Sequence, residues 1–236
     1  MLFSNKSLGM EIFRNGLSLV VAGGSCSAPF VDNFIIDRLP VDVLKTSLKE
    51  TNIIDSSRLK SSISESYSKL CTKIKTVSLS IPDTSGKVLL VDIDTPFKNK
   101  EEGVDHVRWK LKKSFPIDLN DVHLDYQVLR QDASGSTYLL VGIVLKSIVQ
   151  EYENLLLEIG LEPSKIDFTS FNLYRLFSSR LDIQEHLAFV SFYRDALSVL
   201  IFQDGILDFS RNKLISTAAS EPGRLYREIN SSFLVY

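Results

Sequence analysis

The stretch that decides the fold runs from residue 187 to residue 211 and reads LAFVSFYRDALSVLIFQDGILDFSR. Its apolar and turn-forming residues predict three short strands, at 188–192, 197–202 and 206–210. The first two strands are joined across Arg194-Asp195. The last two are joined across Asp204-Gly205, a pair that tolerates the positive φ angles of a tight hairpin. The stretch therefore predicts an antiparallel meander.

A similar pattern occurs near the N-terminus. Apolar segments at 8–12 and 17–21 flank Arg14-Asn15-Gly16, and Asn-Gly is a strong signal for a tight hairpin. A third strand is expected at 30–36. The meander thus appears twice, and this duplication resembles the plan of the ribonuclease-H-like fold shared by actin, sugar kinases and Hsp70. We therefore expect an α/β protein in which two mixed sheets are surrounded by helices.

The middle of the chain predicts helices and strands in turn. Asp55 is placed to cap a helix at 56–72, whose apolar residues recur at helical spacing: Leu59, Ile63, Tyr67 and Leu70. A strand at 77–81 follows. Strands at 88–93, 122–129 and 137–145, with a helix from Asp105 through Ser114, predict a compact β-α-β-β subdomain. A further helix begins at a predicted N-cap, Ser147, and ends at Gly160, which occupies a left-handed C-cap position.

Composition excludes several classes of function. The formal net charge is −2 and the isoelectric point is near 6.0, so the chain has no basic field for nucleic acid. Cys26 and Cys71 lie far apart and the chain has three His, which leaves a metal site without a ligand set. We expect two free thiols in a reducing cytosol. No signal peptide and no apolar run of about 20 residues is found, so a cytosolic location is expected.

One segment resembles a known family closely. Residues 109–129 read WKLKKSFPIDLNDVHLDYQVL. They are similar to the segment of PilM, the type IV pilus assembly protein, that reads Ile-Pro-Phe-Pro-Leu-Asp-Glu-Val and then Leu-Asp-Tyr-Gln-Val-Leu. Flanking segments agree in order, so the resemblance covers nearly the whole chain. These segments are Leu39-Pro40, Ile53-Ile54-Asp55, residues 77–82, residues 158–161 and Lys165-Ile166-Asp167.

The resemblance implies an actin-like fold related to FtsA. It divides the chain into a first lobe at 1–86, an inserted subdomain at 87–146, a return to the first lobe at 147–186 and a partial second lobe at 187–236. Residues 224–233 resemble the helix that precedes the adenine-binding turn of the family, and the sequence ends at Tyr236, so a truncated second lobe is expected.

The resemblance also implies where the protein works and with which partner. It indicates a cytoplasmic protein, peripheral to the inner membrane, that the N-terminal tail of a PilN-like membrane protein recruits. Other inner-membrane components of the pilus platform are further expected partners. We expect contact with the membrane only through these partners, and no contact with nucleic acid.

The PilM family binds ATP, and in this property the sequence departs from it. Near its N-terminus the family has Gly-hydrophobic-Asp-hydrophobic-Gly-Ser, whereas this chain has Glu11 for the Asp and Phe13 for the second glycine. In the second phosphate loop Ser191 replaces the Asp and Tyr193 replaces the glycine. Backbone N–H groups approach a polyphosphate closely only where side chains do not intrude. We therefore expect a pseudo-ATPase with no catalytic residue, no metal and no cofactor, ATP included.

Two carboxylates could compensate for the missing Asp. Glu11 could serve as a metal-binding group and Asp195 could replace the lost Asp of the second loop. Asp is common in tight turns for local hydrogen bonding, and Glu11 has an ordinary place in a hairpin. We favour these structural roles for both residues.

Trp109 and Phe115 are the candidate partner-binding residues. Helical spacing places Trp109 away from the apolar stripe, which consists of Val104, Val107, Leu111 and Phe115. Trp109 is therefore either covered by another layer or exposed for a partner, and the matching aromatic of the family favours burial against the neighbouring lobe. We expect the partner tail to dock in a groove between the inserted subdomain and the first lobe.

Three functions remain open. We favour a non-catalytic scaffold for the assembly of a type IV pilus or a related secretion machine. The second is the cytosolic actin-like domain of a type II secretion protein similar to GspL, which a transmembrane segment in the full reading frame would favour. The third is a working actin-like ATPase with altered phosphate loops, against which both degraded turns argue.

Overall fold

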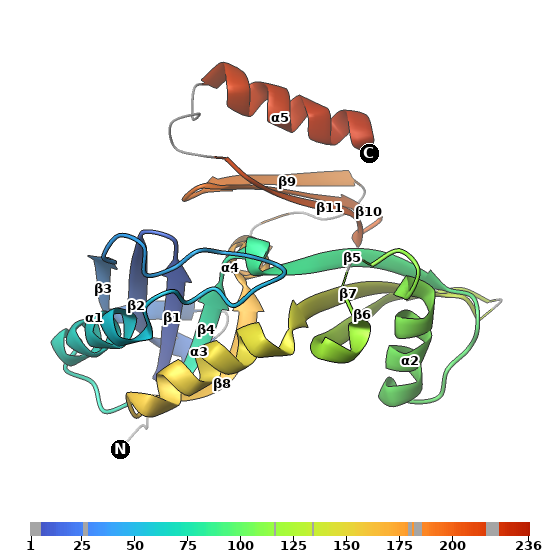
Figure 1. Ribbon diagram of the computed structural model, residues 1–236. Coiled ribbons are helices and arrows are strands. Elements are labelled where there is room, and N and C mark those ends of the chain that lie inside the picture. The colour runs from blue at the N-terminus through green and yellow to red at the C-terminus, as the bar shows by residue number, and fades with distance from the viewer. Residues whose placement is uncertain are drawn as a thin grey trace. The chain divides into compact units, whose positions relative to one another are not determined.

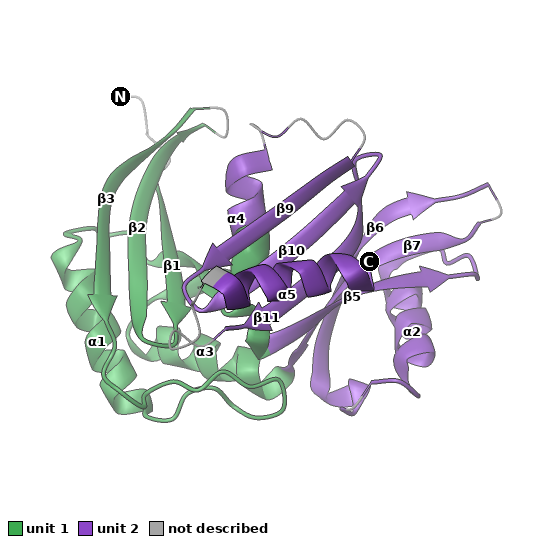
Figure 2. Cartoon of the chain, turned by 90° about the horizontal axis from the view of Figure 1, so that it is seen from above, with its two compact units in different colours: residues 1–85, 146–172 green, residues 86–145, 173–236 purple. Residues whose placement is uncertain are grey.

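The computed structural model describes residues 6–25, 28–115, 117–133, 135–178, 181, 186–215 and 222–236. The chain divides into two compact units, and each is described by itself (Figure 2). The first consists of residues 1–85 and 146–172, and the second of residues 86–145 and 173–236. The four segments that we expected from the resemblance stay a prediction.

The first unit is built on a five-stranded mixed sheet of order β3-β2-β1-β4-β8 (Figure 1). Its antiparallel meander consists of β1 (Ser7–Phe13), β2 (Gly16–Ser25) and β3 (Ala28–Arg38). The parallel strands β4 (Thr76–Ile81) and β8 (Glu162–Phe168) continue the sheet from β1. The meander and the strand at 77–81 are confirmed, whereas β8 was not predicted.

Two helices of the first unit contact each other: α1 (Ser56–Lys69) and α3 (Lys146–Glu158). Asp55 caps α1 as predicted, because its carboxylate accepts a hydrogen bond from the Arg58 N–H at 3.0 Å. α3 buries the expected apolar residues, Ile148, Tyr152, Leu155 and Leu156. Gly160 has a φ of 74° and ends the helix as a left-handed C-cap. The predicted N-cap at Ser147 is wrong, because α3 already begins at Lys146.

The second unit contains the predicted β-α-β-β subdomain. A three-stranded sheet of order β5-β7-β6 holds β5 (Gly86–Ile93), β6 (Val122–Gln131) and β7 (Thr137–Leu145), and α2 (Lys100–Leu111) packs on it. The predicted bounds of the helix, Asp105 to Ser114, are wrong. Asn99 caps α2, because its side-chain oxygen accepts a hydrogen bond from the Glu102 N–H at 2.9 Å. The helix therefore begins before Gly103, a residue that disfavours a helix in the sequence pattern. Gly103 has a packing role, since a Cβ there would lie 2.7 Å from Cζ of Tyr126.

The second meander forms its own sheet of order β11-β10-β9 within the second unit. Its strands are β9 (His186–Tyr193), β10 (Ala196–Gln203) and β11 (Ile206–Leu214). Both residues of the Asp204-Gly205 turn have positive φ, 52° and 74°, as the sequence predicts. α5 (Pro222–Val235) packs on this sheet through Leu225 and Ile229. The two meanders thus lie in separate sheets, as a duplicated fold requires.

Two further features complete the description. α4 (Thr169–Ser178) was not predicted, and its Tyr174 ring stacks on Phe202 of β10 with centroids 4.7 Å apart. Cys71 is an exposed free thiol, whereas Cys26 lies outside the described residues.

Candidate functional site

The β1–β2 turn is the first predicted phosphate loop. Phe13 pairs with Gly16 across this turn. A Cβ added to Gly16 would lie 2.5 Å from Cζ of Phe13, so the phenyl ring lies directly over the Gly16 backbone. Only glycine leaves room for this contact. The ring therefore fills space that an anion would need in order to reach the N–H groups of the turn.

Glu11 lies in a mostly polar row on the sheet face opposite α1. Asp37 of β3 accepts a hydrogen bond from Ser66 of α1, so Asp37 marks the face that α1 covers. Neighbouring positions along a strand point to the other face. On that other face the strand registers place one continuous row across all five strands: Ile36, Ser18, Glu11, Ser80 and Asp167. The row brings two carboxylates to the same side of the sheet.

These two carboxylates are not neighbours within the row. The strand that carries Ser80 separates Glu11 from Asp167, and two strand spacings amount to about 10 Å between their backbones. Asp167 also forms an ion pair with Lys165, with 2.9 Å between Nζ and Oδ2. Within the ranges that the structure describes, no group of three or more His, Cys, Asp or Glu side chains could hold a metal ion.

Ser80 is the centre of a hydroxyl cluster at the carboxyl end of β4. Its Oγ lies 3.1 Å from Oγ1 of Thr169 and accepts a hydrogen bond from Nδ2 of Asn172 at 3.2 Å. Thr169 Oγ1 in turn donates to the carbonyl oxygen of Ile81 at 3.1 Å. The side chains bond mainly to one another, so the cluster fastens the start of α4 to β4.

A buried carboxylate lies beside this cluster. Asp83 follows β4 in a short 3-10 turn (Asp83–Ser85) and accepts hydrogen bonds from the Ser170 N–H, at 3.1 Å, and the Ser170 hydroxyl. The pKa of Asp83 is raised to about 6, mainly by burial and to a smaller extent by the nearby charge of Asp167, against the opposing effect of the hydrogen bonds from Ser170. Sequence reasoning took Pro82-Asp83 only as the end of a strand, because nothing local in the sequence reveals a partner at position 170.

The β9–β10 turn is the second predicted phosphate loop. Arg194 has a φ of 60°, and its guanidinium carbon lies 5.0 Å from the centroid of the Tyr193 ring. The carbonyl oxygen of Asp195 accepts a hydrogen bond from the Ile215 N–H at 2.6 Å. Ser191 is half-buried within β9, opposite Ser198 of β10. A ring and a cation therefore occupy the place at which a phosphate-binding turn needs glycine.

The two candidate partner-binding aromatics, Trp109 of α2 and Phe115 beyond it, occupy different environments. Trp109 is 81% exposed, and its burial against the neighbouring lobe stays a prediction. Phe115 lies beyond the helix end, is half-buried and donates its N–H to the carbonyl oxygen of Leu111 at 2.9 Å. The chain has one tryptophan, so its fluorescence reports on this surface alone.

Comparison with known proteins identifies the family. The sequence matches the family described as Type IV pilus assembly protein PilM over residues 11–214. The chain belongs to the PilM family. No curated protein sequence matches it significantly. The family match confirms the resemblance on which the predictions were based.

Solved structures similar to this PilM-family chain share its fold. One is a PilM-PilN type IV pilus biogenesis complex, with a TM-score of 0.78 and 18% identity over 90% of this chain. This chain spans 62% of the length of that PilM-PilN match. A Bacteroides thetaiotaomicron protein with an actin-like ATPase fold and unknown function matches with a TM-score of 0.53 and 13% identity, over 98% of this chain and 77% of its own.

A secretion protein shares the fold as well. The cytoplasmic domain of EpsL, an inner membrane component of the type II secretion system of Vibrio cholerae, matches with a TM-score of 0.53 and 11% identity, over 89% of this chain and 71% of its own. Together these likenesses confirm the actin-like α/β fold. No helix in the described part of this PilM-family chain is both long enough and apolar enough to span a membrane.

Proposed function

We propose that this PilM-family chain is a non-catalytic scaffold for the assembly of a type IV pilus. The match to the PilM family over residues 11–214 carries the proposal. The scaffold works in the cytoplasm at the inner membrane, which it reaches through its partners. Phe13 over the first turn and Tyr193 with Arg194 at the second support a structural role over an enzymatic one.

The partner that we propose is the N-terminal tail of a PilN-like inner-membrane protein. A PilM-PilN complex among the similar structures supports this choice. Trp109 offers the tail a large exposed aromatic surface, and Phe115 follows it in the segment just beyond α2. Tryptophan is enriched among the residues that dominate binding energy in protein interfaces. The other components of the pilus platform are then recruited through the same complex.

Binding of the tail is expected to move the fluorescence of Trp109 to shorter wavelength. The probe is a synthetic peptide of the N-terminal tail of the PilN-like protein from the same organism. Calorimetry with Trp109→Ala should show binding weakened at least about tenfold, since a central aromatic contact contributes about 1.4 kcal/mol or more. Tyr226→Ala, which removes another exposed aromatic residue, is the matched control and should bind as the wild type does. Failure of the wild-type chain to bind the peptide would refute the proposed partner.

Mg-ATP is expected to bind with a dissociation constant on the order of 1 mM or weaker, about −4 kcal/mol. A triphosphate needs converging N–H donors and a carboxylate on its magnesium, and both turns have lost a glycine. Calorimetry and thermal shift on the full-length protein measure the affinity. Micromolar binding that disappears in Glu11→Ala or Asp195→Ala would show a working site in altered form and would support the ATPase alternative.

A GspL-like role in type II secretion is the second candidate, and the fold shared with EpsL favours it. The two roles differ in the partner. Affinity purification of the chain from its own cells distinguishes them, since a PilN-like protein should be recovered for a pilus scaffold. Recovery of inner-membrane type II secretion components in its place would favour the secretion role.

A further inference from the structure

β3 is an edge strand with an exposed apolar face. Among the residues that the structure describes, β3 pairs only with β2. Four of its large apolar side chains are exposed, and Phe34 and Ile36 expose 61% and 59% of their surface; the other two are Phe30 and Val31. Soluble proteins usually protect such edges with charge, proline or a covering segment, because an open apolar edge is a template for another strand.

The hydrogen-bond pattern shows which backbone groups of β3 face outward. The Leu39 N–H donates to the carbonyl oxygen of Asn15 in the adjoining turn, at 3.1 Å. Because an antiparallel ladder alternates, Asp37 and Ile35 then bond to β2, whereas the N–H and C=O groups of the even-numbered residues point away from it. The Phe34 N–H agrees with this assignment, since it bonds to the side chain of Asn33 at 2.9 Å rather than to β2.

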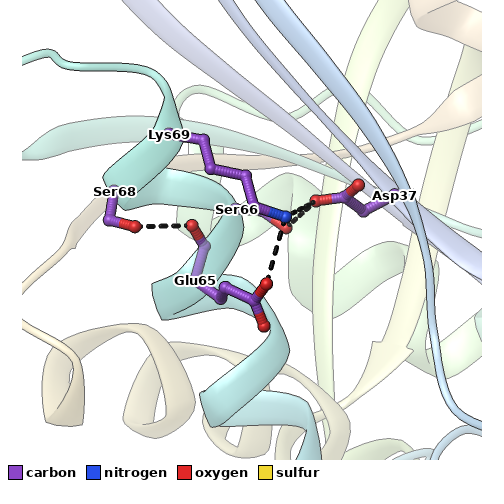
Figure 3. A network of polar contacts seen from close by, with 5 residues as sticks. All are labelled: Asp37, Glu65, Ser66, Ser68 and Lys69. Atoms are coloured by element: carbon purple, nitrogen blue, oxygen red, sulfur yellow. Dashed lines mark hydrogen bonds and ion pairs between the residues drawn. The ribbon is translucent and has the colours of Figure 1, made fainter.

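The side chains follow the same alternation. Asp37 accepts hydrogen bonds from Ser66, at 2.6 Å, and from Lys69, at 3.2 Å, and both lie on α1 (Figure 3). The Ser66 hydroxyl is the main cause of the lowered pKa of Asp37, and Lys69 lowers it further. These bonds hold one face of β3 against α1. Phe34 and Ile36 therefore project from the opposite face.

We propose that β3 pairs antiparallel with β3 of a second copy of this chain, with Ile36 on the two-fold axis. A bulge at Asp32 limits the regular part of the strand to Asn33 through Arg38. The outward-facing backbone groups of this part belong to Phe34, Ile36 and Arg38, and on pairing the Phe34 N–H would exchange its bond to the Asn33 side chain for one to the second copy. Only one register gives the backbone groups of all three residues partners on the second copy. In this register Ile36 lies opposite Ile36 of the second copy, and Phe34 lies opposite Arg38 of the second copy.

The side chains suit this register. Ile36 of one copy packs on Ile36 of the other, and each Phe34 ring faces the guanidinium of an Arg38, a favourable cation–π arrangement. α1 does not obstruct the pairing. α1 packs on both β2 and β3, so its axis lies over the gap between them, about half a strand spacing from β3. The two paired β3 strands would be one strand spacing apart, so the axes of the two α1 helices would be about 10 Å apart. This distance is normal for packed helices.

The interface is small, and this sets the expected affinity. Six residues from each strand bury less surface than the roughly 1,200 Å² of a stable specific complex. The dimer should therefore be weak, with a dissociation constant on the order of 10 to 100 μM. Sedimentation velocity of the full chain between about 1 and 500 μM measures it. Ile36→Lys should weaken dimerisation more than tenfold, whereas Ile54→Lys, an isoleucine with the same 59% exposure, should leave it unchanged.

Cysteine cross-linking tests the register. In a chain with Cys26 and Cys71 replaced by serine, Ile36→Cys should form a disulfide-linked dimer on oxidation, because directly opposed residues have Cα atoms about 5.5 Å apart. Phe34→Cys should not, since its two copies would be separated by several residues along the strands. The proposal is overturned by a chain that stays monomeric at 500 μM, by a dimer that Ile36→Lys does not weaken, or by equal cross-linking through Phe34→Cys.

Discussion

The free energy of unfolding of the first unit is expected to fall by about 4 kcal/mol when Asn52 is replaced by alanine. Asn52 is fully buried. Its Nδ2 donates to the carbonyl oxygens of Ser47, at 2.9 Å, and Glu50, at 3.0 Å, and its Oδ1 accepts from the Ser85 hydroxyl at 2.6 Å. Alanine leaves the buried Ser85 hydroxyl and two carbonyls without this partner and leaves a cavity. Each lost partner costs about 1 to 3 kcal/mol.

The position of Asn52 explains why one residue has so large an effect. It lies in the connection from β3 to α1, residues 39–55, in which Leu44 and Ile53 form an isolated bridge. The Glu151 carboxylate on α3 accepts the N–H groups of both Asn52 and Ile53, at 2.5 and 3.0 Å. A long connection without helix or strand needs such bonds to stay ordered, because its backbone groups have few other partners.

Urea unfolding followed by far-ultraviolet circular dichroism measures the effect of Asn52→Ala. Trp109 fluorescence reports on the second unit in the same experiment, so an effect confined to the first unit leaves the fluorescence transition in place. Lys49→Ala, an exposed change in the same connection, is the control and should alter stability by less than about 0.5 kcal/mol. A loss below about 1 kcal/mol for Asn52→Ala would show that the connection does not depend on this amide.

The meanders could be predicted from the sequence because their signals are local. Alternating apolar residues and turn pairs such as Asp204-Gly205 fix a hairpin without reference to the rest of the chain. β8 carries no such signal. Its sequence, EPSKIDF, contains a proline and three charges, and it becomes a strand because β4 offers it a parallel partner. The start of α2 could not be predicted because Gly103 interrupts the helical pattern of the sequence. Glycine is needed there because a side chain would clash with Tyr126.

The site could be predicted only where its residues are neighbours in the sequence. The position of Glu11 and Phe13 in the strand that leads into the first turn follows from the hairpin pattern. The row that aligns Glu11 with Ser80 and, one strand further, Asp167 depends on parallel pairing between strands far apart in the chain, which no local pattern encodes. For Trp109, helical spacing gave the direction of the side chain but did not show whether another layer covers it.

Replacing Asp83 by asparagine is expected to remove a pH-dependent loss of stability between about pH 4 and pH 6. The pKa of Asp83 is about 6 in the folded chain, against an ordinary value of 3.8. In this window the folded state keeps the proton that the unfolded state releases, so the free energy of unfolding falls as pH rises and levels off above the folded pKa. The difference between the two pKa values corresponds to about 3 kcal/mol. The asparagine side chain would keep an oxygen for Ser170 and bury no charge.

Urea unfolding of the wild type and Asp83→Asn between pH 4 and 7.5 measures this effect, because the difference between them cancels the carboxyls that both share. Asp83→Asn should gain about 2.4 kcal/mol over the wild type on going from pH 4 to pH 7, because part of the full difference is already lost at pH 4. Asp167→Asn removes a negative charge that raises the pKa of Asp83, so it should shift the pH range of the stability loss to lower pH. Ser170→Ala removes a hydrogen bond to the ionised carboxylate, so it should shift this range to higher pH. If the free energy of unfolding depended on pH in the same way for the wild type and Asp83→Asn, Asp83 would have the same pKa in the folded and unfolded chain. The hydrogen bonds from Ser170 would then fully offset the effect of burial on this pKa.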